Sequence, residues 1–191
     1  MDYRIGPNVL AAFAKPAAAR DRRTSRGASR AQTIDDPGEE VTDPEINIQS
    51  TTLQVNAQCA FNLFCDLWRV PEWVSIIRSV QVLSRDHLGY PTRAAFLADL
   101  ERGAVGYTLH YQPRPRELTV TWDSDPSSSV IVRGRAHFAP LGEHASMLHY
   151  ELQLDLPAGS LPMWSDPFFE GHAASTVLGD FRDFVHRSVP L

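Results

Sequence analysis

Residues 104–123 read AVGYTLHYQPRPRELTVTWD, and this stretch decides the fold. Apolar and polar residues alternate on both sides of a proline-containing segment, which is typical of two β-strands joined by a turn. The strands expected at 104–112 and 117–123 therefore form a hairpin with one apolar and one polar face. The apolar face carries Val105, Tyr107, Leu109 and Tyr111 in the first strand, and Leu118, Val120 and Trp122 in the second.

The same alternation continues in both directions along the chain. Turn residues separate further expected strands at about 46–55, 78–85, 91–100, 129–139 and 145–156. Short links between successive strands are typical of an antiparallel meander. Helical spacing predicts two short helices after the first strand, at 58–68 and 72–77, and a long helix at 167–187. Its apolar stripe is expected to cover the sheet and consists of Ala174, Val177, Leu178, Phe181, Phe184 and Val185.

The expected helix ends carry recognisable capping residues. Asn56 precedes the first helix, and Asp166 with Pro167 opens the last one. Cys59 and Cys65 lie in the first helix on different faces, because six residues turn a helix by about 600°. We interpret them as reduced thiols of a cytoplasmic protein. No apolar run approaches the length that spans a bilayer, and the apolar stretch near the N-terminus is too short for a secretory signal.

Charge divides the 191-residue chain into an arm and a domain. Residues 1–34 carry a balance of +5, residues 35–45 carry −6, and the remainder carries −4. Few aromatic and large aliphatic residues occur before position 46, so we expect a disordered arm at 1–45 and one folded domain at 46–190. For the arm, three interpretations stay open: an organellar transit peptide, a weak tether to nucleic acid or a membrane surface, and a leader with no specific function.

Short turns also suggest strand registers. Pairing residues of one face predicts the inward rows Tyr107–Trp122–Val130–Leu154, Leu109–Val120–Val132–Leu152 and Tyr111–Leu118–Gly134–Tyr150. In this register Gly134 leaves a gap with two tyrosine hydroxyls nearby. Apolar walls with a few convergent polar groups are typical of a small-molecule cavity, whereas the alternative is a dry core.

Several segments resemble one known superfamily. They are Val55-Asn56-Ala57 before an aromatic-bearing helix, the run Asp66-Leu67-Trp68-Arg69-Val70-Pro71-Glu72-Trp73, and Ile77-Arg78-Ser79-Val80-Gln81-Val82-Leu83, followed by Tyr107-Thr108-Leu109-His110-Tyr111 and His149-Tyr150-Glu151-Leu152. Over about 46–187 the chain resembles the polyketide cyclase/dehydrase and lipid-transport (SRPBCC) superfamily, which includes START, Bet v 1-like, coenzyme Q-binding and aromatase/cyclase proteins. The resemblance implies an α+β helix-grip fold, in which a seven-stranded antiparallel sheet grips the C-terminal helix around a hydrophobic cavity.

Function is less determined than fold, because this scaffold supports transport, sensing and catalysis. The leading hypothesis is binding or transport of a hydrophobic small molecule, such as a lipid, quinone or polyketide. The alternatives are a polyketide cyclase or dehydratase and a partner-binding module whose cavity is filled. Aromatase/cyclase relatives are thought to use a cavity-facing arginine, but in strand 91–100 Arg93 points to the outer face. The expected ligand-binding residues are Trp73, Phe96, Tyr107, Leu109, Tyr111, Trp122, Val132, Gly134, Tyr150, Leu152, His172 and Thr176.

Other site classes lack their residues in the sequence. His110, His137 and His149 fall on the polar face, where solvent-exposed histidines are a better account than a metal site, and we expect no metal and no cofactor. The acidic balance of the domain argues against nucleic acid as its partner. The apolar segment 71–77 resembles the cavity entrance of the superfamily, where transient membrane or protein contact is an open alternative. Monomer and homodimer are both compatible with the sequence.

Overall fold

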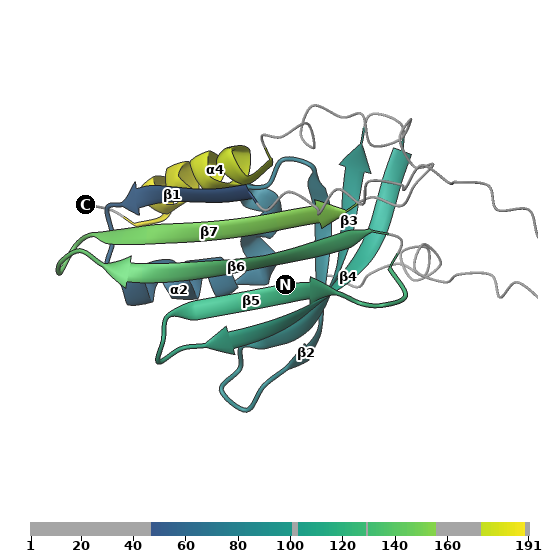
Figure 1. The fold of residues 1–191 in the computed structure, drawn as a ribbon, viewed down its shortest axis with the longest axis horizontal. Coiled ribbons are helices and arrows are strands. Elements are labelled where there is room, and N and C mark those ends of the chain that lie inside the picture. The colour runs from purple at the N-terminus through teal and green to yellow at the C-terminus, as the bar shows by residue number, and fades with distance from the viewer. Residues whose placement is uncertain (1–46, 101–102, 129, 156–172, 190–191) are drawn as a thin grey trace, which may run out of the picture. The chain divides into compact units, whose positions relative to one another are not determined.

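The computed structural model describes residues 47–100, 103–128, 130–155 and 173–189. They form a seven-stranded antiparallel sheet in the order β1-β7-β6-β5-β4-β3-β2 (Figure 1). The strands are β1 (Asn47–Leu53), β2 (Ile77–Arg85), β3 (Pro91–Leu100), β4 (Gly103–Arg114), β5 (Thr119–Ser124), β6 (Ile131–Pro140) and β7 (Ser146–Asp155). The α+β class and the antiparallel meander predicted from the sequence are confirmed. The arm expected at 1–45 lies outside the described residues.

Two short helical segments follow β1. Helix α2 (Ala57–Cys65) begins as predicted, because the Asn56 side chain accepts a hydrogen bond from the Cys59 N–H (2.8 Å). The second segment is a 3₁₀ helix, η1 (Leu67–Glu72), which contains Pro71 instead of starting after it. The predicted helix at 72–77 was therefore wrong, because apolar spacing over so few residues does not separate a helix from a loop.

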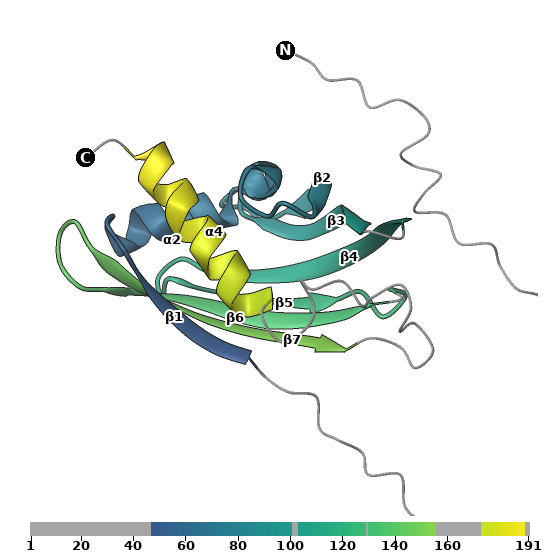
Figure 2. The ribbon, with the colours of Figure 1, turned by 90° about the horizontal axis from the view of Figure 1, so that it is seen from above.

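The C-terminal helix α4 (Ala173–Ser188) carries the apolar stripe that the sequence predicts. All six stripe residues are buried. Figure 2 shows α4 and α2 on the same side of the curved sheet. Arg69 joins η1 to this helix: its guanidinium carbon lies 4.4 Å from the Phe184 ring centroid, and its Nη2 donates to the Ser188 hydroxyl (3.1 Å). The predicted cap at 166–167 lies outside the described residues.

The predicted strand registers were wrong, although the predicted faces were right. Tyr111 pairs with Trp122 and not with Leu118, and Trp122 pairs with Gly134 and not with Val130. Between β6 and β7, Gly134 pairs with Leu152. Leu118 is not a strand residue, because it lies in the turn with a left-handed backbone (φ 49°). Each observed register differs from the predicted one by an even number of residues. Each strand side chain therefore keeps its face of the sheet, while its neighbour on the next strand changes.

Aromatic side chains fill one part of the space between the helices and the sheet. The Phe181 ring of α4 lies 5.3 Å from Phe64, 5.0 Å from Trp73 and 6.4 Å from Phe138, measured between centroids. These are edge-to-face contacts of the kind that aromatic rings prefer. The neighbouring part of the space between helices and sheet, in contrast, stays open.

Candidate functional site

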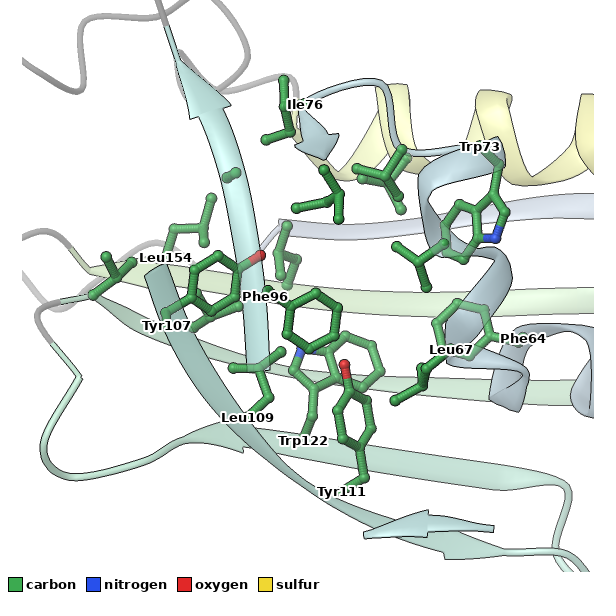
Figure 3. A pocket seen from close by; sticks show the side chains of 18 of the residues that line it. Phe64, Leu67, Trp73, Ile76, Phe96, Tyr107, Leu109, Tyr111, Trp122 and Leu154 are labelled. Atoms are coloured by element: carbon green, nitrogen blue, oxygen red, sulfur yellow. The ribbon is translucent and has the colours of Figure 1, made fainter. Parts of the chain in front are cut away.

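The described domain contains an apolar cavity of about 120 Å³. Its walls come from β2 to β7 on the sheet side, and from α2, η1, the residues that follow η1, and α4 on the other (Figure 3). Phe96, Leu109 and Trp122 represent the sheet side, and Leu67 and Trp73 represent the opposite side. Sheet curvature holds the two sides apart here, so side chains from strands and helices surround one space.

Stacked and tilted rings form much of the wall. Phe96 stacks on Tyr107, with ring centroids 5.3 Å apart and planes 10° apart. The Trp122 ring lies 6.3 Å from Tyr111 and 5.5 Å from Tyr150. Such pairs add stabilisation of about 0.5–1.5 kcal/mol each beyond the burial of their area. The rings therefore hold one another in place and give the cavity flat, rigid walls.

Three tyrosines on the sheet side of the cavity carry hydroxyl groups. In Figure 3 the hydroxyls of Tyr107 and Tyr111 point toward the middle of the pocket. Burial raises the pKa of Tyr107, Tyr111 and Tyr150, and mutual repulsion of the ionised forms raises the pKa of Tyr111 and Tyr150 further. All three are therefore neutral at physiological pH and keep the proton that a hydrogen-bond donor needs.

None of the described residues that line the cavity is charged or carries an imidazole. Arg93 lies on the outer face, as predicted, where its Nη2 is 3.0 Å from Asp125 Oδ2. A cyclase mechanism that depends on a cavity-facing arginine thus has no such residue among those described. Tyrosine hydroxyls are the proton donors that these walls offer.

Nine of the twelve residues expected at the site line the cavity. They are Trp73, Phe96, Tyr107, Leu109, Tyr111, Trp122, Val132, Tyr150 and Leu152. They are brought together because all eight on the strands occupy inward positions of neighbouring strands, while Trp73 follows η1 and is buried.

The expected gap at Gly134 does not exist. The Trp122 indole lies directly over Gly134, and an added Cβ would contact indole Cζ2 and stand 2.5 Å from Cε2 and 2.6 Å from the Glu151 carbonyl oxygen. The register difference explains the error, since Trp122 is the direct partner of Gly134 on β5. Gly134 therefore makes room for an indole of the protein itself and not for a ligand.

Two further expected residues do not contribute to the observed cavity. Thr176 is exposed on α4, on the side away from the buried stripe. It was expected at the cavity because it follows His172 by about one helical turn, but Val177 is the residue of this turn that lines the cavity. His172 lies outside the described residues.

Sequence reasoning missed much of the wall opposite the sheet. The residues concerned are Phe64 on α2, Leu67 and Val70 on η1, and Val74 and Ile76 after it, together with Ile77 where β2 begins. Apolar spacing in 61–68 and 74–77 was the available signal. The segment 71–77, expected as an entrance, turns Trp73, Val74 and Ile77 inward, where they are buried.

A polar cluster lies on the outer face of the sheet. Asp125 accepts hydrogen bonds from the Ser127 hydroxyl (2.6 Å) and backbone N–H (3.0 Å), and His110 Nε2 lies 3.1 Å from its other oxygen. Together these contacts hold the pKa of the Asp125 carboxyl far below its usual range. The hydrogen bonds from Ser127 lower this pKa most, and the charge of Arg93 lowers it least. The cluster connects the loop after β5 to β3 and β4.

His137 and His149 pair across β6 and β7, with ring centroids 5.8 Å apart. Within the described ranges, no group of three or more metal-ligating side chains is present. Cys59 and Cys65 are free thiols. Burial raises the pKa of the Cys65 thiol to about 12. None of the helices in the described ranges has the length and apolar composition needed to cross a bilayer.

Comparison with known proteins identifies the fold. Neither a protein-family model nor a curated protein sequence matches the chain. Among solved structures, a START superfamily protein from Mycobacterium smegmatis aligns with a TM-score of 0.63 at 15% identity, over 75% of this chain and 99% of that one. The Zhui aromatase/cyclase from Streptomyces sp. R1128 aligns at 0.61 with 12% identity, over 78% of this chain and 100% of that one.

A third similar structure is norcoclaurine synthase from Thalictrum flavum, solved with dopamine and hydroxybenzaldehyde. It aligns with a TM-score of 0.55 at 7% identity, over 84% of this chain and 100% of that one. The chain therefore has the START/Bet v 1-like helix-grip fold. At these identities the likeness establishes the fold and not an activity.

Proposed function

We propose that this protein binds a hydrophobic small molecule in its internal cavity. The observation that carries the proposal is an apolar space of about 120 Å³ between the helices and the sheet. Protein interiors are packed as densely as organic crystals and contain few voids larger than a water molecule. Apolar walls with a few polar groups are typical of ligand sites.

The volume favours a small ligand. An engineered apolar cavity of about 150 Å³ takes one benzene molecule, whereas sites for drug-sized ligands are commonly about 300–1,000 Å³. The cavity as it stands thus suits a single ring. A long-chain lipid or a large polyketide needs the side chains around the cavity to move apart, and Val74, Ile76 and Val177 stand on the side where helices and loops form the wall.

The catalytic alternative has one observation in its favour, which is fold similarity to aromatase/cyclases. Against it, the described walls offer no carboxylate, imidazole or guanidinium to act as a base or to polarise a carbonyl. The alternative of a partner-binding module with a filled cavity is disfavoured by the open space. Ligand binding is therefore the function that these residues support best.

Filling the cavity tests the proposal. Ala98 is buried on the cavity wall of β3, so Ala98→Leu places three additional carbon atoms in the space. We expect Ala98→Leu to abolish binding of toluene with little loss of stability. NMR chemical shifts of the protein measure toluene binding. The matched control is Ala104→Leu, because Ala104 is exposed and does not line the cavity.

Two results would contradict the proposal. Toluene binding that survives Ala98→Leu places the probe elsewhere. If Ala98→Leu lowers the free energy of unfolding by about 1–3 kcal/mol, and the unmodified protein does not bind toluene, the space is closely packed core. Native mass spectrometry of the protein purified from its own host then identifies the ligand that it carries.

A further inference from the structure

The tyrosine hydroxyls of the cavity have no hydrogen-bond partner within the part of the chain that the structure describes. No hydrogen bond joins the hydroxyl of Tyr107, Tyr111 or Tyr150 to any described residue, although other side-chain hydroxyls, such as that of Tyr90, make one. The indole N–H of Trp73, which also lines the cavity, is buried without an acceptor among the described residues. The hydroxyls of Tyr107 and Tyr111 thus point into an apolar space without an acceptor from the described residues (Figure 3).

A buried donor without an acceptor is costly. Leaving such a group unsatisfied costs about 1–3 kcal/mol, and the Trp73 N–H is in this position. The tyrosine hydroxyls border the open space, where they donate readily to any acceptor that enters it. A bound molecule excludes water from these hydroxyls, so one with an oxygen acceptor restores a hydrogen bond, whereas a pure hydrocarbon leaves the hydroxyls unpaired.

The charge of this molecule is also restricted. The described cavity wall supplies no cation, so an ionised carboxylate that entered it would lose its hydration without gaining an ion-pair partner. The tyrosines stay protonated, since burial raises the pKa of each. They can donate to a carbonyl oxygen but cannot balance a full negative charge as a lysine or arginine does.

The walls favour a planar ring. Phe96 and Tyr107 are stacked, and Trp122 lies between Tyr111 and Tyr150, so an aromatic ligand meets flat ring surfaces on the sheet side. We propose that the cavity selects an uncharged ring compound bearing a carbonyl oxygen, with Tyr107, Tyr111 and Tyr150 as the hydroxyl donors that recognise it. This inference rests on the proposed function, because it requires that the cavity binds a ligand.

Three probes of equal heavy-atom count test the selection. Cumene has no acceptor, acetophenone has a neutral carbonyl, and benzoate is ionised at neutral pH. We expect acetophenone to bind about three- to tenfold more tightly than cumene, which corresponds to one net hydrogen bond. We expect benzoate to show no binding at neutral pH. Chemical-shift titration of the full chain measures all three affinities.

Tyrosine variants identify the donors. Each of Tyr107→Phe, Tyr111→Phe and Tyr150→Phe removes one hydroxyl and keeps the ring. We expect at least one of them to remove the advantage of acetophenone over cumene while cumene affinity stays within about twofold. A variant that merely loosens the fold weakens both probes together. The control is Tyr90→Phe, because the Tyr90 hydroxyl donates to Asn62 Oδ1 (3.2 Å) outside the cavity.

The outcomes separate this inference from the proposed function. Equal affinity for cumene and acetophenone overturns the role of the hydroxyls, as does an acetophenone preference that survives all three variants, and in both cases cavity binding stands. Benzoate binding as tight as that of acetophenone overturns the selection against charge. If none of the three probes binds, the proposed function fails and this inference fails with it.

Discussion

Gly134 provides the sharpest test of the described packing, because adding one methyl group there should destabilise the protein. The Cβ of Gly134→Ala would contact Cζ2 of the Trp122 indole and stand 2.6 Å from the Glu151 carbonyl oxygen. A backbone oxygen cannot rotate away as a side chain can, so β6 and β7 must separate or the indole must move. Overpacking of this kind costs about 1–3 kcal/mol.

The measurement is urea unfolding followed by tryptophan fluorescence and circular dichroism. We expect Gly134→Ala to lower the free energy of unfolding by about 1–3 kcal/mol. In thermal unfolding this corresponds to a fall in Tm of about 2–12 °C. Gly179→Ala is the matched control, because Gly179 lies in α4 and nothing stands within 4 Å of the Cβ position. The same chemical change should stabilise the protein there by about 0.5–1 kcal/mol.

Opposite signs for the two substitutions support the described register. A neutral or stabilising Gly134→Ala would refute it, because it would mean that the indole does not lie over Gly134. If that happened, the pairing of Trp122 on β5 would have to be reassigned, and the wall of the cavity with it.

Three other predictions concern groups away from the cavity. Asp125→Asn should lower Tm at neutral pH, because contacts in the folded state depress the pKa of the Asp125 carboxyl. This stabilisation is present above the ordinary pKa of about 4 and is lost as pH falls below it. The unfolding curves of the two proteins should therefore converge in acid. Unchanged separation between the curves at low pH would contradict this. Thiol reagents should modify the half-buried Cys59 before Cys65 in the native protein, because burial raises the pKa of the Cys65 thiol to about 12. Peptide mapping by mass spectrometry measures the two modification rates. Equal rates at Cys59 and Cys65 would exclude the described burial of Cys65. Ser146→Ala removes a buried hydrogen bond to the Val55 carbonyl oxygen (2.9 Å) and should cost about 1–3 kcal/mol in urea unfolding, whereas a change near zero would show that this carbonyl finds another donor.

The sequence was sufficient to predict which residues face inward. Tyr107, Leu109 and Tyr111 alternate with polar residues, and a period of two residues assigns each to one side of the sheet without knowledge of its neighbours. The stripe on α4 follows from helical spacing in the same way. These local periodicities explain why the fold class and much of the sheet side of the cavity wall could be predicted.

Register could not be predicted in this way. A slip of two or four residues leaves every apolar side chain on its face, so the alternation of Trp122 and Val120 with polar residues is equally satisfied by several pairings. The turn decides among them, and here Leu118 adopts a left-handed backbone that a leucine rarely takes and that no sequence rule anticipates. The misplaced gap at Gly134 follows directly from this turn.

The cavity itself depends on three-dimensional packing. Leu67, Val74 and Ile76 reach it from η1 and the residues that follow η1, and η1 is held by the contacts of Arg69 with α4. Such contacts join residues more than a hundred positions apart, beyond the reach of local pattern. The sequence could therefore predict an apolar interior, but not where that interior stays open.

The position of β1 in the sheet has a consequence for how the chain reaches its native state. Among the seven described strands, β1 lies at one edge of the sheet and pairs with β7, which comes last of the seven along the chain; the paired residues Ser50 and His149 are separated by 99 positions. Closing so long a loop is slow, and proteins rich in distant pairings fold in milliseconds to seconds. While the chain is growing, β1 therefore waits with its backbone unpaired until β7 has been made. Completion of the sheet is thus a late step of folding, and the period before it is when the nascent chain is most exposed to aggregation.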